Sequence, residues 1–200
     1  MKQHTIFFDL GNVLIFFDHS KMCRQIAEFC GLGTEVVQSV MERYGDLYER
    51  GEIDSHTLHN TFCQMAKKQL DFGKLMHAVS DIFAPNSPVI TIAHELKRKG
   101  HRLFLLSNTC EAHFSHLSLM FPFIRIFDGR VLSYEVRARK PEKKIYEKAL
   151  AIAGCHHGKE CFYTDDILPY IESARSMEID AEQYTTPEQL IRHLHARRIL

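Results

Sequence analysis

The sequence has no excess of charge of either sign and no apolar run long enough to cross a membrane. Its 25 lysines and arginines balance 25 aspartates and glutamates, so nothing in the composition favours nucleic acid or an anionic membrane as a partner. A membrane-spanning helix needs roughly 20 consecutive apolar residues, and no such run occurs. No basic and then apolar leader precedes the first predicted strand. We therefore expect a cytoplasmic protein that binds neither nucleic acid nor membranes.

The sequence also lacks the cysteine spacing of a disulfide framework. Its six cysteines are scattered, and most lie within apolar periodic segments, which favours reduced and buried thiols. Internal repeats, low-complexity tracts and Gly/Ser-rich linkers are absent as well. A chain of 200 residues with this composition suffices for one core domain with a small insert.

The chain begins with a strand-like segment and continues with a long helical one. Asp9 closes a short apolar run, and this run predicts the first strand, over about residues 5–10. In the segment that follows, apolar residues recur at three-to-four spacing between scattered glycines, which predicts a bundle of about four short helices. We therefore expect a core domain of residues 1–16 and 84–200, with a helical insert of residues 17–83.

After the insert, strands and helices alternate. Helices are expected over residues 88–99, 111–120, 141–153, about 167–177 and 187–198, and strands over 103–106, 161–164 and 179–184. The irregular segment 121–139 could contain two short strands, over 123–127 and 130–132. Such an alternation predicts a parallel sheet covered by helices on both faces. The predicted fold class is α/β, a doubly wound, mostly parallel, Rossmann-like sheet with an inserted helical bundle.

Polar side chains occur where the predicted strands end. Asp9, Ser107 with Asn108, and Asp165 with Asp166 end three of these strands, and a fourth site lies at Lys140. Because the carboxyl ends of strands in a doubly wound sheet meet at one crevice, we expect these groups to lie together. An attacking carboxylate, a divalent cation on oxygen ligands, and a lysine and hydroxyl that stabilise developing charge make a phosphoryl-transfer site.

The motifs at these positions resemble those of the haloacid dehalogenase (HAD) superfamily, in the same order. They read Phe8-Asp9-Leu10-Gly11-Asn12-Val13, Leu106-Ser107-Asn108-Thr109, Arg139-Lys140-Pro141 and Phe162-Tyr163-Thr164-Asp165-Asp166-Ile167. The helical insert looks like the first type of cap in this family, so the resemblance covers essentially the whole chain. Within the superfamily, the motifs look most similar to those of phosphatases of the bacterial α-D-glucose-1-phosphate type. The resemblance implies the HAD fold with a helical cap.

The resemblance also implies a Mg²⁺ site. Asp9 would be both the nucleophile and a metal ligand, and Gly11 could offer the metal only its backbone carbonyl. Asp166 would supply the usual metal carboxylate, with Asp165 beside it as an outer or alternate ligand. Since adjacent side chains of an extended segment point to different sides, we expect only one of these two aspartates to contact the metal directly.

The remaining motif residues would bind the substrate. By the same resemblance, Ser107 and Asn108 would hold the phosphate group, and Lys140 would neutralise the phosphate and the nucleophile. The implied activity is that of a Mg²⁺-dependent phosphatase that forms an aspartyl-phosphate on Asp9. Its partner would be a small phosphorylated metabolite, such as a sugar phosphate. The sequence leaves open whether the protein is a monomer or a homodimer.

The sequence departs from the family pattern at three places, the third being Glu178 and Arg137, which replace usual glycines near motifs four and three. Family phosphatases carry a second aspartate two residues after the nucleophile, and Gly11 replaces it here; general acid–base help of this kind is worth roughly 10²–10⁴-fold. After Asp166, residues Ile167, Pro169 and Tyr170 replace the usual small polar and Asn/Asp residues. Two alternatives therefore stay open: a non-catalytic or weakly active HAD-fold binding or regulatory protein, and, with less support, a haloacid dehalogenase.

Overall fold

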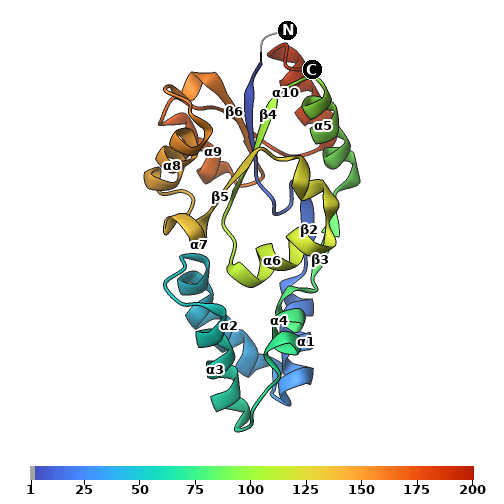
Figure 1. Ribbon diagram of the computed structural model, residues 1–200, viewed down its shortest axis with the longest axis vertical. Helices are drawn as coiled ribbons and strands as arrows, with labels where there is room; N and C mark the ends of the chain where they lie inside the picture. The colour runs from blue at the N-terminus through green and yellow to red at the C-terminus, as the bar shows by residue number, and fades with distance from the viewer. Residues whose placement is uncertain (1–2) are drawn as a thin grey trace.

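A five-stranded parallel sheet forms the centre of the structure, a computed structural model that describes residues 3–200 (Figure 1). The strands are β1 Thr5–Phe8, β4 Arg102–Ser107, β5 Gly129–Leu132, β6 Cys161–Asp165 and β7 Asp180–Gln183. They stand in the order β5, β4, β1, β6, β7, and every neighbouring pair is parallel. The sheet therefore grows outward from β1 in both directions, and the predicted doubly wound α/β class is confirmed. Met1 and Lys2 of the predicted core lie outside the described residues.

The central strand β1 is buried on both faces. Successive side chains of a strand point to opposite faces, and here Ile6 and Phe8 enter one hydrophobic cluster while Phe7 enters another. All three side chains are almost fully buried. A continuous apolar run is what a central parallel strand requires, because helices cover both of its faces. The end of this run fixes Asp9 directly after the last buried residue of the strand.

Helices cover the two faces of the sheet. On one face lie α5 (Ser87–Arg98) and α10 (Pro187–Ala196), and on the other lie α8 (Lys143–Ala153) and α9 (Leu168–Arg175) (Figure 1). Helix α6 (Glu111–Met120) follows β4 and has the predicted bounds. The short elements that complete the core are η1 Pro122–Ile126, α7 Ser133–Val136 and η2 Gly158–Glu160.

The insert consists of four helices, as its periodicity predicts. They are α1 His19–Cys30, α2 Thr34–Glu49, α3 Ser55–Ala66 and α4 Phe72–Ser80. Their apolar faces pack into a hydrophobic cluster of their own, in which Ile26, Leu58 and Phe62 are fully buried. Asp18, Asp54 and Asp71 begin three of the helices as N-caps, each accepting a backbone N–H bond from the first turn.

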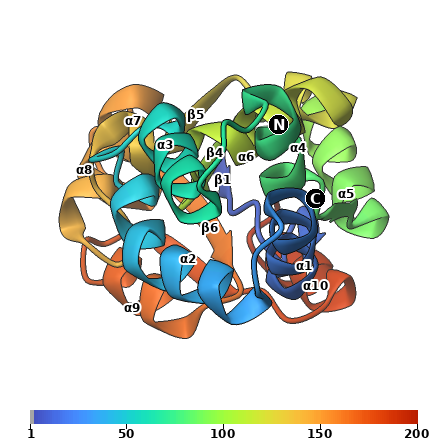
Figure 2. The ribbon, with the colours of Figure 1, turned by 90° about the horizontal axis from the view of Figure 1, so that it is seen from below.

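A two-stranded antiparallel ribbon lies at the two ends of the insert. Its strands are β2 (Ile15–Phe17) and β3 (Phe83–Pro85), with Phe16 paired to Ala84. The four insert helices form the lower part of the molecule, toward which the carboxyl ends of β1 and β4 point (Figure 1). Seen from below, they lie in front of β1, β4 and β6 (Figure 2). The predicted division into core and cap places both of its boundaries inside this ribbon, and it stays a prediction.

Two local predictions are wrong. Residues 123–127 do not form a strand, because residues 123–126 lie in the 3-10 helix η1, which Pro122 begins, and Phe127 follows as its C-cap. Proline has no N–H for a strand ladder, and its φ suits the first turn of a helix. The helix expected from Pro141 begins only at Lys143, because Glu142 is still extended. The peptide bond between Lys140 and Pro141 is cis. The strands β2 and β3 were not predicted, since three residues are too few to show a periodicity.

Two further sequence predictions concern the thiols and the membrane. Each of the six cysteines is a free thiol, and Cys30, Cys110 and Cys161 are buried. Among residues 3–200, no helix has both the length and the apolar character needed to span a bilayer.

The turn after α2 brings the insert against the core at a glycine. Gly51 has a φ of +65°, and a Cβ on it would lie 2.3 Å from the backbone oxygen of Tyr134 in α7. Only glycine permits both this left-handed conformation and this close approach.

We expect Gly51→Ala to lower the free energy of unfolding more than Gly154→Ala does. Gly154 also has a φ of +65°, but a Cβ there would meet nothing within 4 Å. Both variants therefore incur the cost of a left-handed backbone at alanine. Only Gly51→Ala adds a clash between its Cβ and the Tyr134 backbone oxygen, which should cost about 1–3 kcal/mol more. Urea denaturation measures both values. Equal losses would show that the insert does not press on α7 at this point.

Candidate functional site

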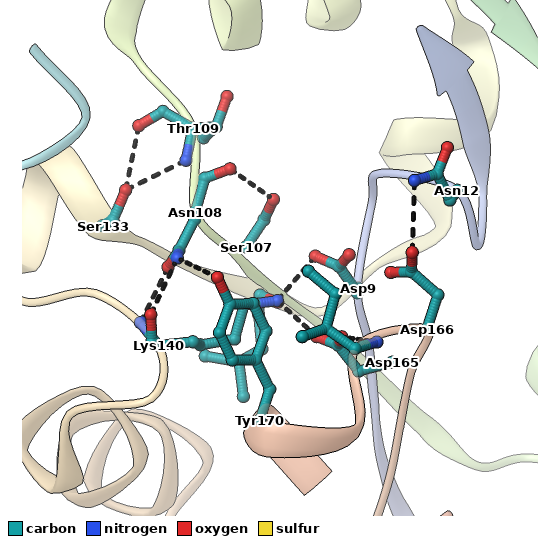
Figure 3. A network of polar contacts seen from close by, with 12 residues as sticks. Asp9, Asn12, Ser107, Asn108, Thr109, Ser133, Lys140, Asp165, Asp166 and Tyr170 are labelled. Carbon is teal, nitrogen blue, oxygen red and sulfur yellow. Dashed lines mark hydrogen bonds and ion pairs between the residues drawn. The ribbon is translucent and has the colours of Figure 1, made fainter. Parts of the chain in front are cut away.

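Four predicted residues meet at the carboxyl ends of the central strands (Figure 3). Asp9 follows β1, Ser107 ends β4 and Asp165 ends β6, and Lys140 approaches them from the segment before α8. They are brought together because β1 lies between β4 and β6 in the sheet. All four are buried, with exposed fractions of 7% for Asp9 and 2% or less for the others.

Lys140 is the centre of this cluster. Its Nζ donates to Asp9 Oδ1 at 2.8 Å and to Asp165 Oδ2 at 2.5 Å. A third bond, of 3.1 Å, goes to the backbone oxygen of Leu106, so all three ammonium protons have acceptors. Burial by itself lowers the pKa of Lys140, but the charges of Asp165 and Asp9 outweigh it and hold this pKa above its ordinary value. Lys140 is therefore a fixed positive charge.

Burial also acts on Asp9. It raises the pKa of Asp9 to about 7, against the charge and hydrogen bond of Lys140, and the nearby Asp165 charge adds to the rise. One oxygen of Asp9 is bound by Lys140. The other, Oδ2, lies on the side of Gly11, where a Cβ would be 3.8 Å from it. Asp9 thus has one anchored and one available carboxylate oxygen.

The two adjacent aspartates after β6 have different environments. Asp165 is fully buried and uses both oxygens, since Oδ2 accepts from Lys140 and from the Tyr163 hydroxyl and Oδ1 accepts from the Ile167 N–H at 2.8 Å. Asp166 is partly buried and accepts a single side-chain bond, of 3.1 Å, from Asn12 Nδ2. Burial raises the pKa of Asp166.

The three aspartates could hold a metal ion. Each of Asp9, Asp165 and Asp166 offers a carboxylate oxygen, and these oxygens lie within 4.8 Å of one another. Carboxylate oxygens are the ligands that Mg²⁺ prefers. Among residues 3–200, no other group of three or more His, Cys, Asp or Glu side chains has its ligand atoms this close together.

Gly11 lies where the family's second aspartate would stand. A Cβ on Gly11 would lie 2.8 Å from Cε1 of Phe17 and 3.8 Å from Asp9 Oδ2. The missing side chain would therefore lie close to Asp9. Its space is occupied by the aromatic ring of Phe17.

Asn108 holds the backbone of Lys140. Its Oδ1 accepts from the Lys140 N–H at 2.8 Å, and its Nδ2 donates to the Lys140 carbonyl at 3.0 Å. The Ser107 hydroxyl is less engaged, donating at 3.3 Å to the Asn108 carbonyl. Of the two residues predicted to bind phosphate, Ser107 thus has the freer side chain, and Asn108 positions the lysine.

Several residues of the site were missed from the sequence. Tyr163 could have been found, because residues two apart in a strand share a face and Tyr163 precedes Asp165 by two. Ser133 carried no such signal; its hydroxyl bonds the N–H and the carbonyl of Thr109, both at 2.9 Å, and so holds the loop after β4. Tyr170, one of the departures from the family pattern, places its ring 5.1 Å from Lys140 Nζ.

A cavity of about 630 Å³ lies next to this cluster, and we call it the side pocket. It is lined by residues of α1 and α2, together with Cys110 and His113 at the start of α6. Arg139, the neighbour of Lys140, forms an ion pair with Glu49 of this lining at 3.0 Å. Burial raises the pKa of Glu49, and burial lowers the pKa of His113 to about 4.

Comparison with known proteins gives one family. Residues 3–177 match the model of the haloacid dehalogenase-like hydrolases. Among curated proteins, the sesquiterpene phosphatase astK of Aspergillus oryzae is 23% identical over 171 residues, which are 85% of this chain and 84% of that protein.

Solved structures share the fold. The HAD family enzyme BT-2542 of Bacteroides thetaiotaomicron, in complex with magnesium and inorganic phosphate, is 22% identical, with a TM-score of 0.81 over 92% of this chain and 95% of that one. L-2-haloacid dehalogenase of Xanthobacter autotrophicus is 15% identical, with a TM-score of 0.63 over 100% of this chain and 85% of the other.

The lowered pKa of His113 predicts a loss of stability in acid. Between pH 6.5 and about 4, an unfolded histidine binds a proton that the folded His113 does not, so its contribution is complete above pH 6.5 and is lost as the pH falls toward 4. Relative to His113→Gln, the wild type should lose about 1–3 kcal/mol of unfolding free energy across this window. Urea unfolding at a series of pH values measures the difference.

The control is His94→Gln, which removes an exposed histidine from α5. Its stability should follow the wild-type pH profile. A His113→Gln profile that also parallels the wild type would contradict the assignment of a neutral, buried imidazole to His113.

Proposed function

Because the chain belongs to the haloacid dehalogenase-like hydrolases, we propose that it is a Mg²⁺-dependent phosphomonoesterase. The observation that carries the proposal is the position of Asp9: a buried carboxylate at the end of the central strand, anchored through Oδ1 by Lys140, with Oδ2 available. Such a carboxylate is placed to act as a nucleophile.

In the proposed reaction, Asp9 Oδ2 attacks the phosphorus atom of a phosphate monoester. The new O–P bond forms an aspartyl-phosphate, and the bond from phosphorus to the alcohol oxygen breaks. The alcohol leaves with its electron pair and takes a proton from water. A second water molecule then attacks the aspartyl-phosphate, which releases inorganic phosphate and returns Asp9. Lys140 would stabilise the negative charge of both the nucleophile and the phosphate oxygens.

Mg²⁺ would be held by carboxylate oxygens of Asp9 and Asp166. We prefer Asp166 to Asp165, because both oxygens of Asp165 already accept hydrogen bonds, and the carbonyl of Gly11 remains a candidate third ligand. When bound, the cation would supply positive charge that offsets the repulsion between carboxylate and phosphate. The structural relative BT-2542 binds magnesium and inorganic phosphate, which supports Mg²⁺ as the cation.

The substrate would be a small phosphorylated metabolite whose phosphate lies against Ser107 and the loop after β4. The motif similarity to glucose-1-phosphate phosphatases indicates a sugar phosphate. The relative astK, a sesquiterpene phosphatase, indicates an ester of a more apolar alcohol. Both candidates are phosphate monoesters, so they share the same chemistry at Asp9.

A haloacid dehalogenase is an alternative with less support. A halide leaves without a proton, so a site with Gly11 in place of the acid would serve that reaction, and the fold is shared with L-2-haloacid dehalogenase. Three clustered aspartates favour the phosphatase, because a dehalogenase needs no cation site. A binding protein without activity is the other alternative, since Ile167, Pro169 and Tyr170 replace the usual residues after Asp166 and the Tyr170 ring lies 5.1 Å from Lys140 Nζ.

Asp9→Asn should lower Mg²⁺-dependent phosphate release from an aryl phosphate by at least about 10³-fold, because the amide cannot form the acyl-phosphate. Addition of EDTA to the wild type should stop the reaction, and Mg²⁺ should restore it. The matched control is Asp81→Asn, which alters a half-exposed carboxylate of the insert. Halide release from a chloroacid in EDTA would instead support the dehalogenase, and no turnover of either substrate would support the binding protein.

Restoring the missing acid requires room beside Phe17. We expect the double variant Gly11→Asp with Phe17→Ala to accelerate hydrolysis of alkyl phosphates by about tenfold or more, and that of p-nitrophenyl phosphate much less, because a good leaving group needs little protonation. Gly11→Asn with Phe17→Ala is the isosteric control without an acid. Equal rates for these two double variants would refute the acid role assigned to the position of Gly11.

A further inference from the structure

On one side, two residues of the side pocket, Cys110 and Glu49, lie close to the proposed phosphate site. Cys110 of the lining lies three residues after Ser107 and begins α6. Glu49 of the lining pairs at 3.0 Å with Arg139, the residue before Lys140. The pocket therefore begins where the phosphate-binding loop ends.

Aromatic rings connect the same two places on the other side. Phe17 occupies the space beside Gly11 and Asp9. The ring of Phe17 also contacts that of His19, with the centroids 4.8 Å apart, and His19 is part of the pocket lining. A phosphate ester at Asp9 would thus have its leaving group directed past the face of Phe17 and toward the side pocket.

The polar groups deep in the pocket already have partners within the protein. The Tyr48 hydroxyl is bonded to Ser55 Oγ at 2.6 Å and to the Ala112 N–H at 3.2 Å. His113 Nε2 donates to the Val79 carbonyl at 3.2 Å, and Glu49 is paired with Arg139 as described. These groups are not free to bind several hydroxyls of a ligand.

Apolar and soft groups form the rest of the buried lining. Met22, Tyr48 and Cys110 are buried, and Cys23 and Met41 are partly buried. The exposed lining residues are the polar ones, among them Gln38, which bonds Glu42 at 3.0 Å. An apolar interior with a polar rim is the usual construction of a site for an apolar ligand, and thioether and thiol groups adapt to its shape.

We propose that the side pocket binds the apolar organic group of a phosphate monoester, so that the substrate is the phosphate of an apolar alcohol rather than of a sugar. The inference rests on the proposed function. A buried sugar would leave several hydroxyls without partners, and each such loss is costly. An alkyl or alkenyl chain loses no hydrogen bonds by entering and gains from every buried methylene. The aromatic ring of Phe17 adds an apolar wall in place of the acid.

The test compares n-hexyl phosphate with D-glucose 6-phosphate, which are phosphates of primary alcohols with the same number of carbon atoms. In Mg²⁺, we expect kcat/KM to be at least about tenfold higher for hexyl phosphate. A binding measurement gives a readout that does not depend on turnover: n-hexylphosphonate should bind the Mg²⁺-loaded protein at least about tenfold more tightly than methylphosphonate, by isothermal titration calorimetry.

The variant Met41→Gln places a polar group of similar length in the pocket, and Met41→Leu is its apolar control. Met41→Gln should reduce the ratio of kcat/KM for hexyl phosphate to that for methyl phosphate by about tenfold, and Met41→Leu should change this ratio by less than about twofold. The same order is expected for the phosphonate affinities.

Different results would refute the pocket proposal and the phosphatase proposal. Hydrolysis that depends on Asp9 but favours glucose 6-phosphate, or an equal effect of Met41→Gln on both phosphonates, overturns the pocket proposal and leaves the phosphatase intact. Absence of Asp9-dependent hydrolysis together with tight binding of hexylphosphonate overturns the phosphatase and supports the pocket.

Discussion

The buried ammonium of Lys140 is the interaction on which the rest of the site depends. It joins three neighbouring strands, because its acceptors come from the ends of β1, β4 and β6. A buried ion pair contributes little net stability, whereas removal of one partner costs about 3–5 kcal/mol by leaving a charge unpaired. The lysine therefore does more than assist the proposed nucleophile Asp9. It makes a cluster of buried carboxylates tolerable, and so permits the site to exist at the centre of the sheet.

The core of the site could be predicted because it depends on features with a clear sequence signal. The apolar run before Asp9, the strand before Ser107 and the strand before Asp165 mark three sheet positions, and the order of a doubly wound fold brings their ends together. The helices of the insert followed from three-to-four periodicity, whereas their aspartate caps were seen only in the structure. The one side chain that crosses from elsewhere, Lys140, was found through the family motif and not through periodicity.

The parts that could not be predicted depend on contacts between distant segments. The ring of Phe17 fills the space beside Gly11 only because the unpredicted ribbon of β2 and β3 turns it there. The bonds of Asn108 to the Lys140 backbone join residues 32 positions apart. Proline gave an ambiguous signal, since Pro122 begins a 3-10 helix where a strand was expected, whereas Pro141 stays outside its helix. Local propensity does not carry such information.

The replacement of an acid by a glycine has a different meaning once its surroundings are known. Had the space beside Gly11 been open to water, the site would be a phosphatase with a part removed. The space is instead filled by the ring of Phe17, which contacts His19 in the lining of the side pocket. The polar groups deep in that pocket already have hydrogen-bond partners. Loss of the acid and gain of an apolar wall are thus one structural change. In the proposed reaction, a leaving group bound by apolar contacts has no general acid, but its binding energy, which acts far from the reacting atoms, can support the chemical step.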